Sequence, residues 1–297
     1  MEICFISLPA WGEPLRPKLG NSSKPATLQN CLTRKPGMVY YCPMKIIAIA
    51  NQKGGVGKTA TAAALGDLLA QHGRRVLLLD LDPQSSLTQG LGIEARGASL
   101  AEVIGGAKRG PLTMQQIIKP LGDRLDIAPA DIALAGCELG MIERLGRENI
   151  VKGLLRDLQG YDVVIIDCPP ALGLLTVNGL IAAHGVIVPT LPAAADLRGV
   201  RLFMDTLNQL RNDGLNPLLE LIGVLFVQYD PRLNAHMLAS DELKAAAWPV
   251  IGMIPRSVKV QESSAALQPV TRYDPNSKPA QAYIELERKI TSWLKRK

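Results

Sequence analysis

The chain has 297 residues, of which 47% are apolar and 20% are charged, so it is long enough for one large domain or two small ones. No apolar run reaches the roughly 18 residues that a membrane-spanning helix needs. Five cysteines without paired spacing argue against a disulfide framework. The formal net charge of +6 and the isoelectric point of about 9.1 indicate an acidic partner, such as nucleic acid or a membrane surface.

Residues 1–43 differ in composition from the rest of the chain. They hold five Lys or Arg residues against two acids, six of the 21 prolines and three of the five cysteines, with no periodic apolar pattern. We interpret this segment as a disordered or non-native N-terminal extension. Two alternatives stay open: a basic transit peptide, and a start of translation at Met44, where MKIIAIA opens directly as a strand.

From Met44 onward, short apolar runs alternate with segments of helical spacing. In chain order the pattern predicts strand 45–50, helix 59–72, strand 75–79, strand 126–128, helix 138–158 with a break near Gly146, strand 162–166, helix 172–184, strand 186–189, helix 197–212, strand 221–227, strand 250–254 and helix 280–294. Such alternation is typical of βαβ units. We therefore predict a single α/β domain over 44–297, with a mostly parallel, twisted sheet covered by helices on both faces.

The stretch NQKGGVGKTA, residues 51–60, follows the first predicted strand and has most of a phosphate-binding loop. The motif G-x-x-x-x-G-K-[ST] closes with Lys58 and Thr59, but its first position holds Gln52, and the next one holds a second lysine, Lys53. Glycines in such a loop let backbone N–H groups surround phosphate oxygens at the start of a helix. Lys58 is expected to reach the β- and γ-phosphates, and the Thr59 hydroxyl to ligate Mg²⁺.

Carboxylates follow two further predicted strands. In LLLDLDPQSS, Asp80 and Asp82 come just past a strand, where they could also act as loop or helix caps. In YDVVIIDCPPALG, an apolar strand ends in Asp167, which is the Walker-B arrangement for a carboxylate near Mg²⁺. Because ligands of parallel sheets bind at the carboxyl ends of the strands, these acids are expected beside the phosphate loop. We interpret Asp162 as structural and Cys168 as a small buried residue.

These motifs, together with LDIAPADIALAGCE and the tail IPRSVKVQESSAALQPVTRYDPNSKPAQAY, resemble the ParA/Soj partition ATPases. That family belongs to the deviant Walker-A, or MinD/ParA, group of P-loop NTPases. The resemblance extends from Met44 almost to the C-terminus, and Gln52 in place of the first glycine matches the partition branch. It implies a P-loop NTPase fold, ATP and Mg²⁺ as cofactors, and slow ATP hydrolysis stimulated by a partner protein.

The resemblance also answers why one loop holds two lysines. In the family, the lysine at the position of Lys53 crosses the interface of a nucleotide-sandwich dimer to the second subunit's nucleotide, while Lys58 serves its own subunit. Asp82 is implied to position the attacking water. The implied catalytic residues are therefore Lys53, Lys58 and Asp82, and the implied magnesium-binding residues are Thr59, Asp80 and Asp167.

The implied contacts to ATP fall into two sets. On the base side, the loop after the last predicted strand supplies three residues, and the family often has Asn where Ser257 stands, so that contact is weaker or runs through the backbone. Gln228 follows another strand and is a further base-side candidate. The two sets are Lys53, Gly54, Gly55, Val56, Gly57, Lys58, Thr59 and Ala60 in the loop, and Gln228, Pro255, Arg256 and Ser257 on the base side.

Residues 256–297 contain nine Lys or Arg residues and four acids. By resemblance, the ATP-bound homodimer binds double-stranded DNA without sequence preference through such residues, and the binding weakens with salt. The matching positions are Arg232 and Lys259, and further candidates are Lys278, Arg288 and Lys289. Because only 4% of the residues are aromatic, a stacking platform for single strands is not expected. The implied partner is a ParB-type centromere-binding or analogous adaptor protein, and the implied location is cytoplasmic and nucleoid-associated.

Four alternatives start from other features. A MinD-like membrane cycler would use the C-terminal ITSWLKRK, with Trp293 and Leu294 as an interfacial anchor, although we expect that region to be a packed helix. An iron protein would need suitably placed cysteines, and Cys137 and Cys168 do not match that pattern. A nucleotide-gated scaffold would bind DNA with scarcely any turnover. A cargo-positioning ATPase of the same fold would differ only in its partner.

Overall fold

The computed structural model describes residues 44–95, 97–105 and 112–296. Met44–Arg296 form one compact unit. The predicted extension over residues 1–43 lies outside the described residues and stays a prediction. Among the described helices, none is both long and apolar enough to span a membrane.

An eight-stranded sheet organises the described part of the chain, in the order β3-β4-β2-β5-β1-β6-β7-β8. All neighbouring strands pair in parallel except β3 and β4, which are antiparallel. The predicted mostly parallel α/β sheet is therefore confirmed. The strands are β1 Lys45–Ile49, β2 Val76–Asp80, β3 Lys119–Pro120, β4 Leu125–Ala128, β5 Val163–Asp167, β6 Gly185–Thr190, β7 Glu220–Tyr229 and β8 Val250–Pro255.

Alternate residues of each central strand enter two separate hydrophobic cores, because side chains of a strand point to opposite faces of the sheet. In β1, Ile46 and Ala48 join one core, while Ile47 and Ile49 join the other. Both faces of the sheet are thus apolar, which is why the central strands appear in the sequence as continuous apolar runs.

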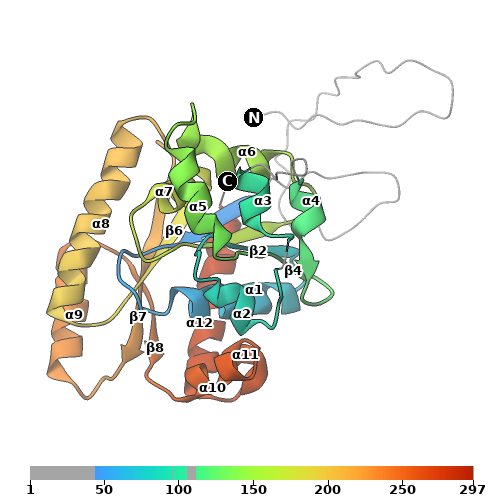
Figure 1. The fold of residues 1–297 in the computed structure, drawn as a ribbon. Coiled ribbons are helices and arrows are strands. Elements are labelled where there is room, and N and C mark those ends of the chain that lie inside the picture. Colours follow the sequence, from blue (N-terminus) through green and yellow to red (C-terminus); the bar gives the residue numbers. More distant parts are fainter. Residues whose placement is uncertain (1–43, 96, 106–111, 297) are drawn as a thin grey trace, which may run out of the picture. The chain divides into compact units, whose positions relative to one another are not determined.

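Helices cover both faces of the sheet (Figure 1). One core is covered by α3 Leu100–Gly105, α4 Met114–Ile117, α5 Ala133–Met141, α6 Ile150–Arg156, α7 Leu174–Ala182, α8 Ala194–Asn212 and α9 Asn234–Ala245. The opposite core is covered by α1 Lys58–Gln71, α2 Ser86–Gly90, α10 Lys259–Ala265, α11 Val270–Tyr273 and α12 Lys278–Leu294. The phosphate loop connects β1 to α1, so it opens at the carboxyl edge of the sheet.

One predicted helix is interrupted where the sequence indicated a break, although its first part begins earlier, at Ala133, and another helix was not predicted. The helix predicted over 138–158 is divided into α5, the short 3-10 helix η2 Arg147–Asn149, and α6. Gly146, at φ 66°, makes the predicted break. Helix α9 was not predicted, because it buries only Ala239, Ser240 and Leu243 and therefore lacks a strong apolar stripe in the sequence.

Candidate active site

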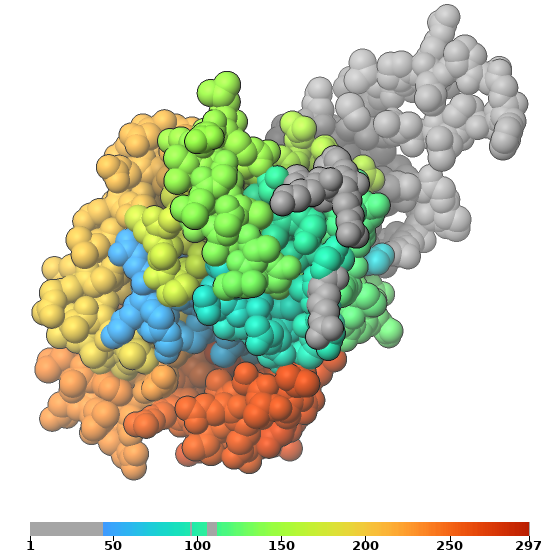
Figure 2. Space-filling model, in the orientation of Figure 1, coloured from blue at the N-terminus to red at the C-terminus, as the bar shows by residue number. Residues whose placement is uncertain are grey.

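The carboxyl ends of β1, β2 and β5 lie next to one another, and they bring the predicted phosphate loop and carboxylates to one edge of the sheet. In the strand register, Asp167 stands beside Ile49 on one side and beside Asp80 on the other. Lys53, Gly54 and Gly55 are exposed. Figure 2 shows the blue segment that contains this loop at the surface, among parts coloured yellow, teal and orange. The edge is therefore open to a ligand.

Glycines give the phosphate loop its shape. Gly55 and Gly57 have φ of 72° and 77°, in the left-handed region that strongly favours glycine. A Cβ on Gly57 would lie 3.3 Å from Val227 Cγ1, so the loop also packs closely against the end of β7. No side chain caps the start of α1. The first amide groups of the helix are left to bind an anion.

The Lys58 ammonium points back over the loop. Its Nζ donates a hydrogen bond of 2.9 Å to the carbonyl oxygen of Lys53. Burial lowers the pKa of Lys58, and the carboxylate of Asp167 acts in the opposite direction. A buried cation whose hydrogen bonds are not all used is suited to receive phosphate oxygens.

Asp167 is a buried carboxylate without a hydrogen bond from any described residue. Burial and the nearby charge of Asp80 raise the pKa of Asp167 well above its usual range, while Thr59 and Lys58 act in the opposite direction. The Thr59 hydroxyl thus lies close to the Asp167 carboxylate. A carboxylate in this state fits a cation, because a bound cation would stabilise its charged form.

The described residues include no group of three or more His, Cys, Asp or Glu side chains that could hold a metal ion. The unpaired buried carboxylate of Asp167 suits Mg²⁺, which usually takes one or two protein carboxylates and otherwise binds phosphate oxygens and water. Thr59 and Asp167 are the residues that would hold it.

Asp80 uses both carboxylate oxygens within its own subunit. Oδ2 accepts from the Thr88 amide at 2.9 Å and the Thr88 hydroxyl at 2.6 Å, and Oδ1 accepts from the Asp82 amide at 3.1 Å. Burial raises the pKa of Asp80 to about 6. Asp80 therefore lies beside the candidate cation site, and its oxygens are held by Thr88 and by the Asp82 amide. Thr88 was not predicted from the sequence as a member of the site.

Asp82 lies at the same edge, near the entrance of the site. It is buried, and its Oδ1 accepts the Gln84 amide at 2.9 Å. That hydrogen bond fixes the turn after β2, so the carboxylate keeps a constant position relative to Asp80. Asp82 is thus available as a group that could orient a water molecule next to the phosphate loop.

Lys53 is exposed as expected, but its side chain is not free. Its Nζ lies 2.6 Å from Asp196 Oδ1 in an ion pair. Its backbone amide donates to Asn51 Oδ1 at 3.1 Å, and Asn51 is anchored by its own hydrogen bond of 2.7 Å to the carbonyl of Pro189. Neither Asn51 nor Asp196 was predicted from the sequence as a member of the site.

The four base-side residues come together at the ends of β7 and β8. Tyr229, which follows Gln228, pairs with Pro255, and the Arg256 amide donates to the Tyr229 carbonyl at 3.4 Å. Gln228 has a positive φ of 54° at the end of β7. Since Val227 of the same strand contacts Gly57, this group lies beside the phosphate loop. The Ser257 hydroxyl already makes one hydrogen bond within the chain, because its Oγ accepts the Lys259 amide at 3.2 Å.

The two predicted DNA-binding residues follow the same two strands. Arg232, in the loop after β7, forms hydrogen bonds of 2.9 and 2.7 Å with Asp230, and these bonds hold the pKa of Asp230 well below its usual range. Lys259, at the start of α10, pairs with Glu262 at 2.8 Å. Both cations lie near the site, with Arg232 exposed and Lys259 half-buried, and both carry an acidic neighbour, which a phosphate backbone would have to displace.

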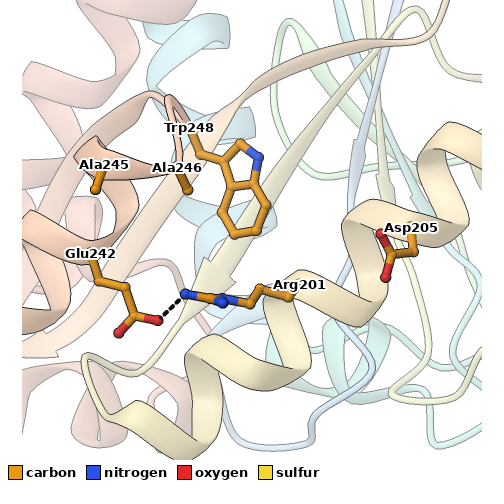
Figure 3. Close-up of a pocket in the computed structure, with 6 residues that line it drawn as sticks. All are labelled: Arg201, Asp205, Glu242, Ala245, Ala246 and Trp248. Carbon is orange, nitrogen blue, oxygen red and sulfur yellow. Dashed lines mark hydrogen bonds and ion pairs between the residues drawn. The ribbon is translucent and has the colours of Figure 1, made fainter.

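A second hollow lies away from this edge, between α8 and α9. It has a volume of about 530 Å³ and is crossed by the ion pair of Arg201 with Glu242 at 2.6 Å (Figure 3). Trp248 and Asp205 also line it. None of the predicted site residues lies there.

The C-terminal segment does not present an apolar anchor. Trp293 and Leu294 are buried in the core that α12 shares with α1, and Trp293 Nε1 donates to Glu220 Oε2 at 2.6 Å. Tyr283 and Leu286 are buried in the same core, and Ile284 packs against it. The expectation that α12 is a packed helix is confirmed, and the proposed cue for membrane binding is wrong.

Known proteins resemble this chain over most of its length. The AAA-domain family matches residues 44–221. The sporulation initiation inhibitor protein Soj of Bacillus subtilis is 38% identical over 252 residues, which cover 84% of this chain and 98% of Soj. The chromosome partitioning protein ParA of Caulobacter vibrioides is 38% identical over 257 residues, which cover 84% of this chain and 95% of that protein. The chain belongs to the ParA/Soj family of P-loop ATPases.

Solved structures agree with this assignment. A Mycobacterium smegmatis protein described as cobyrinic acid a,c-diamide synthase, with bound ATP analogue and magnesium, is 38% identical. It has a TM-score of 0.73, with 84% of this chain and 96% of that chain covered. The cell division ATPase MinD of Pyrococcus furiosus, with a TM-score of 0.70 and 22% identity, shares the fold over 84% of this chain and 99% of its own. The ParA/Soj chain studied here is thus a P-loop NTPase of the ParA/MinD type.

Proposed function

We propose that this ParA/Soj family member is a DNA-partition ATPase that binds ATP with Mg²⁺, dimerises, binds double-stranded DNA without sequence preference, and is released by hydrolysis. One observation carries the nucleotide part: a glycine loop, a buried lysine and an unpaired buried carboxylate meet at one open edge of the sheet. Hydrolysis is slow until a ParB-type centromere-binding or analogous adaptor protein stimulates it, and the protein acts in the cytoplasm on the nucleoid.

In this proposal, each protein group next to the phosphates has a separate role. The amides of the loop and of the first turn of α1 bind phosphate oxygens, together with Lys58. Thr59 and Asp167 hold Mg²⁺, which neutralises charge on the β- and γ-phosphates when it is bound. The Asp80 carboxylate, held in place by Thr88, adds negative charge at this edge of the sheet.

Two further residues act on the reaction itself. Asp82 orients the attacking water in line with the terminal phosphate. Lys53 extends to the nucleotide of a second subunit, where its charge stabilises the negative charge that spreads over the transferred phosphoryl group. Because the second nucleotide is then part of the interface, ATP favours the dimer. Gln228, Pro255, Arg256 and Ser257 contact the base and the ribose.

An exposed apolar face beside the site supports the dimer. Leu139 on α5 is 71% exposed, and Ile132 just before the helix and Ile142 and Leu145 in the turns after it are exposed as well. Helix α5 borders the first turn of α7, which follows the loop after β5, because Glu138 accepts the Leu175 amide at 3.1 Å. That loop also borders the phosphate loop, where a Cβ on Gly54 would lie 3.9 Å from Pro170. A second subunit facing the nucleotide would cover this apolar face as well.

The DNA-binding part rests on charge and on relatives. The C-terminal segment from residue 256 holds nine Lys or Arg residues against four acids, and relatives at 38% identity are named chromosome partitioning proteins. Arg232 is exposed and Lys259 is half-buried near the nucleotide edge, so a change of subunit arrangement there would change the charge that they present to DNA.

Three alternative functions share this fold. A membrane cycler like MinD would use Trp293 and Leu294 as an exposed apolar anchor, but both side chains are buried. The solved relative at 38% identity carries the name of a synthase, and an enzyme of that kind would need a carboxylate acceptor rather than DNA. A cargo-positioning ATPase would bind DNA as proposed and differ only in its partner.

The test is co-sedimentation with plain double-stranded DNA and, separately, with anionic liposomes. Each mixture is run with ATP and Mg²⁺, with ADP, and without nucleotide, at two salt concentrations. We expect ATP-dependent, salt-sensitive sedimentation with DNA alone. ATP-dependent binding to liposomes alone would assign the protein to a membrane cycle, and nucleotide binding without either would direct the search to a small-molecule acceptor.

A further inference from the structure

Asp196 is a buried carboxylate close to the site that the proposed mechanism does not use. It lies in the first turn of α8, and its side chain is only 4% exposed. Within the part of the chain that the structure describes, its ion-pair partner is Lys53, whose side chain is 52% exposed. An acid on α8 thus holds the lysine that is proposed to reach another subunit, although 143 positions separate the two residues in the sequence.

The main chain of Lys53 is fixed on both sides. Its amide donates to Asn51 Oδ1 at 3.1 Å, and its carbonyl accepts from Lys58 Nζ at 2.9 Å. Asn51 is in turn bound to Pro189, at the end of β6 and just before α8. A change in where the Lys53 ammonium points therefore needs only rotation of its flexible side chain, not movement of the loop.

The ion pair makes that rotation costly. If the ammonium leaves, the buried Asp196 carboxylate loses its cation, and an uncompensated buried charge is strongly unfavourable. The ammonium will leave only for a site with more negative charge, and the phosphates of a second nucleotide supply one. The phosphates of a second nucleotide arrive only with a second subunit.

We propose that Asp196 is a positioning residue that holds the Lys53 ammonium in its own subunit until a second nucleotide-loaded subunit arrives. This proposal rests on the proposed function of Lys53 in trans. Asp196 thereby raises the concentration at which ATP-loaded subunits dimerise, and it keeps Lys53 from binding other anions in the isolated subunit.

The first test uses the nucleotide-free monomer and does not depend on dimerisation. An amine-acylating reagent is added in brief exposure, and mass spectrometry measures modification of Lys53 relative to the exposed Lys244. We expect Asp196→Asn to raise the modification of Lys53 about fivefold, because removing the carboxylate charge frees the ammonium. Asp205→Asn, which removes the same charge at an exposed position of α8, is the matched control and should leave it unchanged. Equal modification in wild type and Asp196→Asn would overturn the proposal.

The second test is sedimentation equilibrium with Mg²⁺ and a non-hydrolysable ATP analogue. We expect Asp196→Asn to dimerise at about tenfold lower protein concentration than wild type or Asp205→Asn. In a Lys53→Gln background the same substitution should no longer shift the dimerisation midpoint, which a merely structural role of Asp196 would not predict. An unshifted midpoint in the single variant also overturns the proposal. If wild type fails to dimerise at all, the proposed function fails, and the modification experiment alone decides whether Asp196 holds Lys53.

Discussion

Two buried carboxylates stand side by side at the ends of β2 and β5, and their surroundings give them different roles. Asp80 accepts three hydrogen bonds from its own subunit, whereas Asp167 accepts none from the described residues. The unpaired carboxylate is the one expected to gain most from a bound cation. Single side chains at this edge can therefore be tested separately.

Replacement of Asp167 by Asn keeps the shape of the side chain and removes its charge. We expect the nucleotide-free protein to keep or raise its melting temperature, because a buried unpaired carboxylate is removed. In the same variant, nucleotide affinity in the presence of Mg²⁺ should fall at least about tenfold, while affinity in EDTA should change little. Thermal unfolding and fluorescent-nucleotide titration measure the two effects. A large loss of stability without nucleotide would contradict the proposed role.

Replacement of Asp82 by Ala removes the group proposed to orient water. We expect ATP hydrolysis to fall by about a hundredfold or more, while ATP-dependent dimers stay bound to DNA. Phosphate release and DNA co-sedimentation measure the two outcomes. Hydrolysis at the wild-type rate would show that another group orients the water.

Lys53→Ala should abolish stimulated hydrolysis in the same assay while leaving part of the nucleotide binding intact.

Secondary-structure elements are connected by side chains at their ends as well as by core packing. His184, just before β6, accepts the Ile46 amide of β1 at Nδ1, with a length of 3.0 Å, and it can do so only as neutral imidazole. Partial burial and the charges of Lys45 and Lys152 lower the pKa of His184. The unfolded chain therefore binds a proton on this residue more readily than the folded one.

That difference predicts a pH dependence of stability. With a lowered pKa in the folded state, the contribution of His184 is present above the usual histidine pKa and is lost as the pH falls below about 6.5. We expect a modest decrease in melting temperature from pH 7 to pH 5, with the decrease reduced in His184→Asn, whose amide oxygen can accept the same hydrogen bond at either pH. Scanning calorimetry of both proteins across this range measures it. Parallel pH profiles would exclude the residue as a cause.

The whole molecule is expected to meet DNA through charges distributed over several elements near the ends of β7 and β8. Substituting both Arg232 and Lys259 by Ala should lower DNA affinity and reduce the slope of log K against log salt by about two per subunit, with ATP binding intact. Arg156→Ala combined with Lys244→Ala is a matched control, because these exposed cations also pair with acidic neighbours. Fluorescence anisotropy over a salt series measures both slopes. Equal slopes in the two double variants would reject the assignment.

Local patterns account for the parts of this protein that could be predicted. The apolar runs of the central strands, the glycine loop and the aspartates after two strands each depend on a few consecutive residues, whose backbone preferences act over the same short distance. From them followed the α/β fold, the parallel sheet and the meeting of Lys58, Thr59 and Asp167 at one edge.

Contacts between distant segments could not be derived in that way. The pairing of Lys53 with Asp196 and the burial of Trp293 against Glu220 depend on which elements pack together and how each side chain is turned. Helix α9 escaped prediction for a related reason, since its packing uses few apolar residues. A motif in the sequence specifies which groups are present, but the packed fold sets which of them are already paired, and for a buried charge that pairing determines what it can still bind.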